Sequence, residues 1–296
     1  MYDAVIIGGG TAGMTAGIYL AGRGKTAVVL ERSSYGGQII NALNVENYPG
    51  IKSISGFDFA TQMYEQLLAG GGSLEFGDVK EIRVNKNSKT VVTEDAEYEC
   101  ERVIIASGAS NRKLGIEGEE ALVGRGISYC ATCDGGFFKG KTVAVVGGGN
   151  TALEDGVYLA DICERVYIIH RRDSFRGEQK TVDELRAKPN VEFVLNAVTD
   201  SLISGEDNKL RGVVVRDKVS GELRELRVDG LFVAVGQVPN TEFVKGLVDM
   251  DEYGYIKAGE DCRTSVDGIY AAGDCRTKEL RQLCTAAADG AASAMY

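Results

Sequence analysis

The chain has 296 residues, with 33 basic and 43 acidic side chains and a formal net charge of −10. Because no run of Lys or Arg forms a basic surface, this balance argues against a nucleic-acid partner. A length of 296 residues predicts two domains, and 39 glycines against 3 prolines are typical of α/β proteins with many tight turns.

An apolar segment begins within two residues of Met1, and no stretch approaches 18 uninterrupted apolar residues. We therefore expect neither a signal peptide nor a transmembrane helix, and a cytoplasmic location. Seven cysteines are too few and too irregularly placed for a disulfide framework. We expect five of them to be isolated, buried and inert thiols: Cys100, Cys163, Cys262, Cys275 and Cys284.

The chain opens with the pattern of strand, glycine turn and helix. Apolar residues 5–7 lead into the sequence GGGTAG over 8–13, and a helical pattern follows over 14–20. In a dinucleotide-binding fold, three glycines tighten the turn, admit a pyrophosphate and let helix and strand pack closely. The three positions here are Gly8, Gly10 and Gly13.

An acidic residue follows the next predicted strand, residues 26–30. This residue is Glu31, which stands 18 positions after Gly13. A carboxylate at this place accepts hydrogen bonds from ribose hydroxyls. The first site is therefore predicted to suit a dinucleotide without a 2′-phosphate.

The same pattern recurs in the middle of the chain. A strand over 142–146 leads into GGGNTA over 147–152, a helical stretch, and a strand over 165–169. The second turn contributes five candidate binding residues, Gly147, Gly149, Asn150, Thr151 and Ala152. The sequence thus predicts two dinucleotide sites.

The second site ends in basic residues where the first has Glu31. Counting 18 positions from Ala152 reaches His170, and three arginines follow, Arg171, Arg172 and Arg176. A 2′-phosphate would be repelled by a carboxylate and bound by guanidinium groups, so this site is predicted to bind NADPH and the first FAD. The alternative is a solvated basic turn.

Two further strands, 103–105 and 231–235, end in turns of small residues. We interpret these turns as chain crossings between an FAD-binding domain, residues 1–111 and 239–296, and an inserted NADPH-binding domain, residues 112–238. The fold class is α/β with two Rossmann-like domains. A late strand ends in Gly273 and Asp274, whose carboxylate could reach a ribityl or pyrophosphate group. The alternative is a strand-end turn with a solvated Asp.

One pair of cysteines is closely spaced, Cys130 and Cys133. Zinc would need two more ligands at similar spacing, which the sequence lacks. Because the same chain is predicted to bind two nucleotide cofactors, we favour the interpretation that this pair is a dithiol that accepts electrons from flavin. The alternative is two incidental buried thiols. Asp134 could give or take a proton at the sulfurs, or could be a plain turn residue. The residues alone do not assign separate roles to the two cysteines.

These motifs together resemble the bacterial low-molecular-weight thioredoxin reductases over nearly the entire chain. The matching segments are 8–13, 36–38, 46–50, 130–135, 147–152, 170–172 with Arg176, 273–274 and 281–282. The resemblance implies a homodimer that reduces a thioredoxin-like thiol protein. It also implies that Cys133 faces the flavin, that Cys130 attacks the partner disulfide and that Asp134 is the general acid.

The resemblance extends the list of cofactor-binding residues. For FAD it adds Gly36, Gly37, Gln38, Asn47, Ala106, Arg281, Gln282 and Leu283, and for NADPH it adds Gly236. In this family the NADPH domain swings relative to the FAD domain, which we expect to occur about crossings near Gly108 and Gly236. The chain departs from the family pattern at Ser107 and at Ala288-Asp289, and both departures look neutral.

Two alternatives remain beside this interpretation. One is a related flavin-dependent reductase that serves another thiol protein. The other, from a different class, is a redox sensor that uses flavin and a disulfide to control a binding partner, although the sequence shows no added recognition module.

Overall fold

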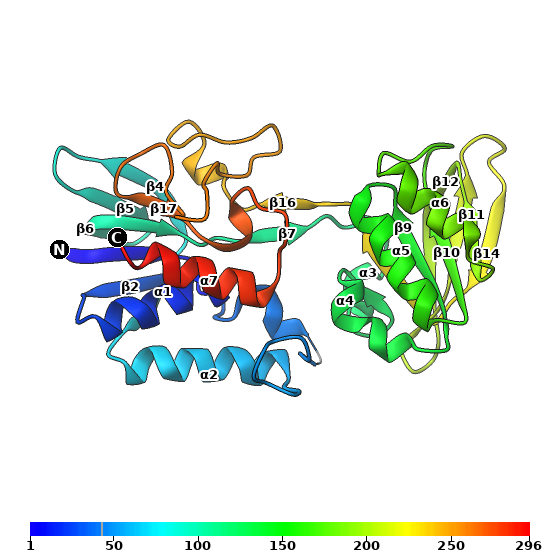
Figure 1. Ribbon diagram of the computed structural model, residues 1–296, viewed down its shortest axis with the longest axis horizontal. Coiled ribbons are helices and arrows are strands. Elements are labelled where there is room, and N and C mark those ends of the chain that lie inside the picture. The colour runs from blue at the N-terminus through cyan, green and yellow to red at the C-terminus, as the bar shows by residue number, and fades with distance from the viewer. Residues whose placement is uncertain (43) are drawn as a thin grey trace. The chain divides into compact units, whose positions relative to one another are not determined.

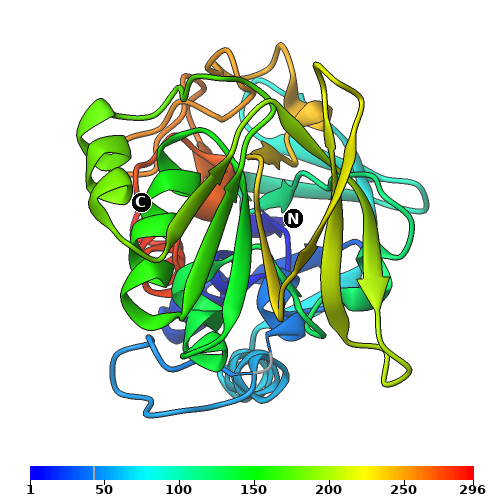
Figure 2. The same ribbon diagram turned by 90° about the vertical axis from the view of Figure 1, so that its right-hand side faces the viewer.

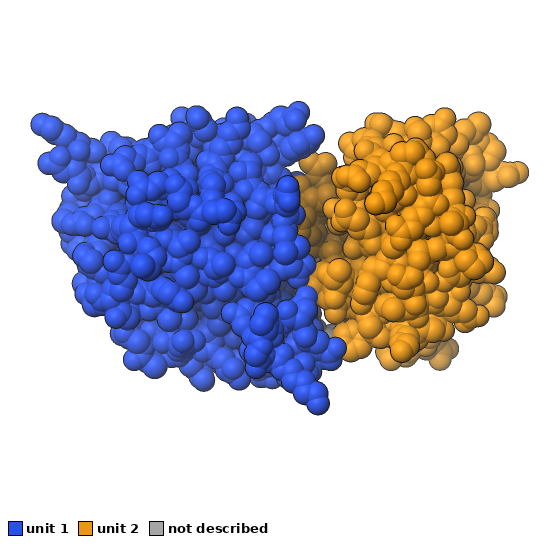
Figure 3. Space-filling model, viewed as in Figure 1, with its two compact units in different colours: residues 1–110, 238–296 blue, residues 111–237 orange. Residues whose placement is uncertain are grey.

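In the computed structural model, which describes residues 1–42 and 44–296, the chain folds into two units. Unit 1 comprises residues 1–110 and 238–296, and unit 2 comprises residues 111–237 (Figure 3). Unit 2 is therefore inserted, in sequence, between the two parts of unit 1. Within the described residues no helix is both long and apolar enough to cross a membrane.

A mixed sheet forms the centre of unit 1, with the strand order β3-β2-β1-β6-β5-β4 and β17 paired to β6 (Figure 1). The strands are β1 (Tyr2–Ile7), β2 (Ala27–Glu31), β3 (Ser73–Phe76), β4 (Val79–Val84), β5 (Lys89–Thr93), β6 (Glu97–Ile105) and β17 (Ile269–Ala271). Strands β3, β2, β1, β6 and β17 pair in parallel, whereas β4 and β5 add an antiparallel edge.

The register of these parallel strands aligns their carboxyl ends. Ile7 of β1 lies opposite Leu30 of β2 and Ile105 of β6, and Ile105 lies opposite Ala271 of β17. The residues that follow the four strands therefore meet at one edge of the sheet, where ligands bind in folds of this kind.

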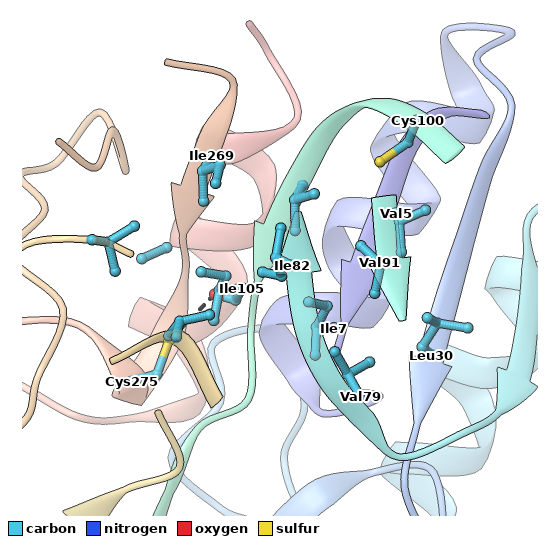
Figure 4. Close-up of a cluster of buried hydrophobic side chains, with 14 of the residues drawn as sticks. Val5, Ile7, Leu30, Val79, Ile82, Val91, Cys100, Ile105, Ile269 and Cys275 are labelled. Carbon is cyan, nitrogen blue, oxygen red and sulfur yellow. Dashed lines mark hydrogen bonds between the residues drawn. The ribbon is translucent and has the colours of Figure 1, made fainter. Parts of the chain in front are cut away.

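Alternating side chains of the central strands enter two different cores. Val5 and Ile7 contribute to the cluster shown in Figure 4, together with Leu30 and Ile105. The intervening residues, such as Ile6, pack on the other face against the helices. Because β1 is buried on both faces, its sequence is apolar throughout rather than alternating.

Three α-helices cover the face of the sheet opposite the Figure 4 core: α1 (Thr11–Gly22), α2 (Gly56–Ala69) and α7 (Leu283–Ser293). Helix α1 packs against both of the others because small residues allow close approach. A side chain at Gly17 would meet Leu67 of α2, and one at Gly290 of α7 would overlap the Ala12 carbonyl oxygen. Unit 1 also contains short 3-10 helices. They are η1 (Gly37–Asn41), η3 (Glu242–Val244) and η4 (Gly273–Cys275).

Unit 2 has a parallel sheet of strand order β11-β10-β9-β15-β8. Helix α5 lies on one face, and a three-stranded antiparallel sheet, β12-β13-β14, lies on the other (Figures 1 and 2). The strands are β8 (Ile127–Ser128), β9 (Thr142–Gly147), β10 (Arg165–Ile169), β11 (Val191–Val194), β12 (Ala197–Ser204), β13 (Leu210–Asp217), β14 (Leu223–Arg227) and β15 (Gly230–Ala234). The helices are α3 (Glu119–Leu122), α4 (Ala131–Asp134), η2 (Gly135–Phe138), α5 (Asn150–Ile162) and α6 (Gln179–Ala187).

The chain passes between the units in two short strands that pair with each other, β7 (Ala109–Asn111) and β16 (Gln237–Pro239). Gly108 precedes β7 and Gly236 precedes β16, and both have positive φ angles, 65° and 106°. Positive φ is readily adopted only by glycine, so each crossing begins at a residue that tolerates a sharp change of direction.

Candidate active site

The first glycine turn follows β1 at the carboxyl edge of the unit 1 sheet. A side chain at Gly8, where φ is +111°, would overlap the carbonyl oxygen of Ala106, and one at Gly13 would overlap that of Gly8. At Gly10, in contrast, the nearest atom to an added Cβ is the Gly37 Cα, 3.9 Å away. The turn is thus packed at its first and third glycines and open at its middle one, as a pyrophosphate site requires.

Glu31 anchors this turn from the end of β2. Its carboxylate accepts a hydrogen bond from the Gly9 amide, at 2.7 Å, and another from the Ser33 amide, at 3.0 Å. Each of these bonds occupies one acceptor site of a different oxygen, and a carboxylate has about four such sites. Glu31 can therefore hold the turn and still accept a ribose hydroxyl.

The segment that follows β2 returns to the same edge. The Gly36 amide donates to the Gly9 carbonyl oxygen at 2.8 Å, and the Gln38 side-chain amide donates to the Ala109 carbonyl oxygen. Asn47 donates to the side chain of Gln282 at 3.1 Å. Gln282 in turn is the N-cap of α7, whose first residue is Leu283. The structure thus brings these sequence-predicted residues to the carboxyl edge of unit 1.

Three buried side-chain atoms at this edge have no hydrogen-bond partner among the described residues: the Oγ of Ser107, the Oδ1 of Asp274 and the Nε of Arg281. Burial raises the pKa of Asp274, against the opposing effect of Lys278 and Arg281. The Arg281 guanidinium also stacks on Tyr255, 4.2 Å from the ring centroid. Buried polar atoms in native proteins are nearly always satisfied. An acceptor and a cationic donor left open beside a glycine turn fit the hydroxyls and phosphates of a dinucleotide such as FAD.

The glycine turn of unit 2 repeats the arrangement of the first. A side chain at Gly147 would overlap the Ala234 carbonyl oxygen, whereas Gly149 has open space around it. The glycine between them, Gly148, is covered by the His170 ring, just as Gly9, between Gly8 and Gly10, is covered by Glu31. His170 therefore occupies the place of Glu31, as the spacing of 18 residues predicts.

His170 differs from the three arginines beside it. It is buried, its Nε2 lies 3.1 Å from the Ser174 carbonyl oxygen, and its ring stacks on Phe175. Burial lowers the pKa of His170, and the charges of Arg171 and Arg172 lower it further. A neutral ring at physiological pH supports the turn but adds no charge to it.

The arginines supply the positive charge. Arg171, Arg172 and Arg176 are exposed, and their guanidinium groups make no hydrogen bond or ion pair within the described part of the chain. The backbone of Arg176 donates to the Gly148 carbonyl oxygen at 2.8 Å, which folds this loop onto the glycine turn. Asn150 fixes the same loop by accepting the Glu178 amide at 2.8 Å.

Cys130 and Cys133 form a disulfide whose Cα atoms lie 5.3 Å apart. The second cysteine belongs to α4, and Cys130 is the N-cap of that helix. Cys133 is exposed, whereas Cys130 is half-buried. Among the described residues the other five cysteines are free. Four of them are buried, as predicted, whereas the prediction was wrong for Cys284, which is exposed on the first turn of α7.

Ser128 links the two ends of this redox motif, and the sequence analysis missed it. Its buried hydroxyl donates to the Asp134 Oδ2 at 2.6 Å and accepts the Cys130 amide at 3.1 Å. Burial raises the pKa of Asp134, and the Ser128 hydrogen bond opposes that rise. Asp134 is thus a carboxyl group inclined to hold a proton beside the disulfide.

A second residue that the sequence analysis missed holds the chain before the disulfide. Glu119 is only 2% exposed, and its carboxylate accepts the amides of Leu114 and Gly115, both at 2.9 Å. It also accepts the Tyr129 hydroxyl at 2.8 Å. Tyr129 directly precedes Cys130, so Glu119 fixes the entry of the chain into the redox motif.

Two dinucleotide-type turns and a redox disulfide define a class of protein, the pyridine nucleotide-dependent disulfide oxidoreductases. The model of the protein family described as "Pyridine nucleotide-disulphide oxidoreductase" matches residues 2–291 of the chain. Thioredoxin reductase of Listeria monocytogenes is 43% identical over 98% of this chain and 91% of its own length. That of Bacillus subtilis is 43% identical over 99% of this chain and 93% of its own.

A solved structure is similar over the whole chain. The thioredoxin reductase of Streptococcus pyogenes is 41% identical, with a TM-score of 0.93 over 99% of this chain and 96% of that one. The chain belongs to the thioredoxin reductases of the pyridine nucleotide-disulphide oxidoreductase family. It is accordingly a flavoprotein oxidoreductase, and enzymes of this family use FAD and NADPH.

The Ser128 hydrogen bond generates a testable prediction. Ser128→Ala removes the donor that stabilises the Asp134 carboxylate, so the pKa of Asp134 should rise further above its usual value. We expect the limb of the pH–rate profile that reports Asp134 to move to higher pH. Turnover should fall by about tenfold, because the acid remains but is no longer oriented, against about 10²–10⁴ for Asp134→Asn.

The check is the pH dependence of kcat for disulfide reduction by both variants. Ser128→Thr keeps a hydroxyl and should restore the wild-type limb. Ser293→Ala removes another buried hydroxyl, one that bonds only to the Gly290 carbonyl oxygen of α7, and should leave the limb in place. An unshifted limb in Ser128→Ala would show that this hydroxyl does not govern Asp134.

Proposed function

We propose that this chain uses NADPH to reduce the disulfide of a thioredoxin-like protein, through FAD and the Cys130–Cys133 pair. The observation that carries this proposal is the placement of the disulfide in the same unit as a dinucleotide-type turn followed by three arginines whose side chains have no partner among the described residues. The relatives named thioredoxin reductase support the choice of thiol partner.

Unit 1 is proposed to hold FAD. When bound, FAD accepts a hydride from NADPH and passes an electron pair to a disulfide. The open glycine Gly10 would admit the pyrophosphate, Glu31 would accept a ribose hydroxyl, and the unsatisfied Oδ1 of Asp274 would accept a ribityl hydroxyl. Arg281 would donate from its unsatisfied Nε.

Unit 2 is proposed to hold NADPH. Its pyrophosphate would lie against Gly149 at the start of α5, where free amides and the helix dipole favour an anion. The 2′-phosphate would be bound by Arg171, Arg172 and Arg176. The neutral His170 would keep the turn in shape.

The two cysteines are proposed to have unequal roles. After reduction of the pair, the Cys130 thiolate attacks one sulfur of the partner disulfide, which breaks that bond and forms a mixed disulfide. The Cys133 thiolate then attacks the Cys130 sulfur, which restores the Cys130–Cys133 bond and releases the partner as a dithiol. Asp134, whose pKa burial raises, supplies the proton that a departing thiolate needs.

Further proposals concern assembly and motion. We propose a homodimer, on the resemblance alone, and a cytoplasmic location, which suits the five free thiols. We also propose that unit 2 turns as a body about the paired crossings at Gly108 and Gly236, so that nicotinamide and the disulfide meet the flavin in turn.

The cysteine roles lead to a prediction about partial reactions. Cys130→Ser and Cys133→Ser should each abolish disulfide reduction while FAD stays bound, because the proposed FAD residues lie in unit 1. NADPH should still reduce the flavin in both variants, which is measured as the loss of the flavin's visible absorbance. As a control, Cys100→Ala replaces a buried thiol far along β6 from the glycine turn, where Cys100 lies opposite Tyr2 in the strand register, and should keep full activity. Loss of flavin reduction in either serine variant would contradict the proposed order of electron transfer.

The arginines lead to a prediction about coenzyme choice. Replacing Arg171 and Arg172 together by Gln removes two charge-assisted contacts worth about 1.5–3 kcal/mol each, so the preference for NADPH over NADH should fall by about 10²–10⁴. The measurement is the ratio of kcat/KM for the two coenzymes. A double variant of Lys180 and Arg186 to Gln removes the same charge from exposed sites on α6 and should keep the preference. An unchanged ratio in the first variant would mean that the cluster is a solvated turn.

A further inference from the structure

Asp289 of α7 is a buried carboxylate with four donors around it. It is 4% exposed. Its Oδ2 accepts the Gly273 amide at 2.8 Å, the Arg276 Nε at 2.8 Å and the Lys278 Nζ at 2.9 Å, and its Oδ1 accepts a terminal nitrogen of Arg276 at 2.7 Å. The sequence pattern had marked this residue only as a neutral departure from its relatives.

The partners of Asp289 are buried as well. The side chains of Arg276 and Lys278 are 2% and 6% exposed. Arg276 also donates to the carbonyl oxygens of Ala258 and Thr277, at 3.3 Å and 3.0 Å. Burial alone would raise the pKa of Asp289, but the bonds from Arg276 and Lys278 hold it below its usual value, so the group is ionised. One anion is thus enclosed with two cations.

Such a network is costly to build. Desolvation of buried charges often cancels their attraction, and well-packed apolar residues can be equally stable in their place. Global stability therefore does not by itself explain why three charged side chains are enclosed here. What the network does provide is a fixed position for the groups that it touches.

The group that it fixes is the turn that carries Asp274. Asp289 binds the amide of Gly273, the residue directly before Asp274. Gly273 has a φ of +75°, and a side chain there would meet the Ala12 Cβ at 2.9 Å. On the α7 side, Gly290 packs on the carbonyl oxygen of the same Ala12. The carboxylate thus connects α7 and η4 at the point where both contact the start of α1.

The charge of Lys278 also acts on Asp274. Burial raises the pKa of Asp274, and the positive charges of Lys278 and Arg281 oppose that rise. The Lys278 ammonium group is directed by one bond to Asp289. Asp289 therefore holds both the Gly273 peptide, which precedes Asp274, and the Lys278 ammonium group, whose charge acts on Asp274.

We propose that Asp289, with Arg276 and Lys278, is a positioning network for FAD: it holds the Gly273 peptide and the Lys278 ammonium so that the Asp274 carboxylate faces the cofactor. This inference rests on the proposed function, because it takes Asp274 to be an FAD ligand. Asp289 itself does not contact the cofactor and acts only through Asp274.

The test is a double-mutant cycle on the rate of FAD release from the full-length holoenzyme. The holoenzyme is diluted, and release is measured as the increase in fluorescence of free flavin. Asp289→Asn keeps the size of the side chain but removes its charge. We expect it to speed FAD release by about tenfold, because a misplaced ligand loses a hydrogen bond to the cofactor. In an Asp274→Asn background the same change should have less than a twofold effect.

Two further variants make the result specific. Lys278→Met leaves the Arg276 pair intact and should show a smaller acceleration with the same dependence on Asp274, which keeps the test open if Asp289→Asn folds poorly. Asp3→Asn removes another carboxylate that accepts a lysine and a backbone amide, at the opposite end of β1, and should not change FAD release.

Three results would overturn the inference. Equal acceleration by Asp289→Asn with and without Asp274 would assign the network to general stability. No acceleration by Asp289→Asn, although Asp274→Asn alone speeds release, would refute the network and leave the FAD site standing. No acceleration by Asp274→Asn alone would refute the proposed role of Asp274 and the network with it.

Discussion

The close packing of a glycine against the end of a neighbouring strand is the constraint on which both nucleotide-type sites depend. Gly8 lies against the Ala106 carbonyl oxygen and Gly147 against that of Ala234. Neither position has room for a Cβ, so each turn can pack against the neighbouring strand only with a glycine there. The glycine two positions later, Gly10 or Gly149, is left open at the start of a helix, where amides and the helix dipole point outward. The parallel register of the sheets sets what surrounds this opening, because it brings the ends of all neighbouring strands to one edge.

The two turns share this geometry but differ in the side chain that covers the second glycine of the run, Gly9 or Gly148. Glu31 accepts the Gly9 amide and places a carboxylate at the turn. His170 covers Gly148 with a ring that burial and neighbouring arginines keep neutral. The difference in charge between the sites therefore comes from one side chain in unit 1 and from the exposed loop after His170 in unit 2. In unit 2, His170 therefore supports the backbone of the turn, while other residues carry the charge that discriminates between nucleotides.

Much of this arrangement could be predicted from the sequence, because it depends on local spacing. The turns, the strands that lead into them and the equivalence of Glu31 and His170 follow from residues within about thirty positions of one another. The strand predicted over 103–105 proved to be the end of a longer one, β6, from Glu97. Its first half alternates exposed and buried residues at an antiparallel edge, which lacks the continuous apolar signal of a central strand.

The residues that the sequence did not reveal are those whose partners are set by tertiary packing. Glu119 lies in an acidic stretch that is typical of a solvated loop, yet it is buried because three donors converge on it. Asp289 meets the Gly273 amide and two cations only once α7 docks on α1. Residue type and spacing carry no signal for such contacts, since the same side chains are usually exposed.

Asp134 and Asp274 show how hydrogen-bond partners separate two roles for one kind of residue. Burial raises the pKa of both carboxyl groups. Asp134 has a donor within the protein, Ser128, and neither of its oxygens is among the buried atoms left without a partner by the described residues. Asp274 has an oxygen that no described residue satisfies. A buried carboxyl group that already has a donor from the protein suits proton transfer. One that lacks a donor suits binding of a ligand that brings it, because leaving the oxygen unpaired would cost about 1–3 kcal/mol.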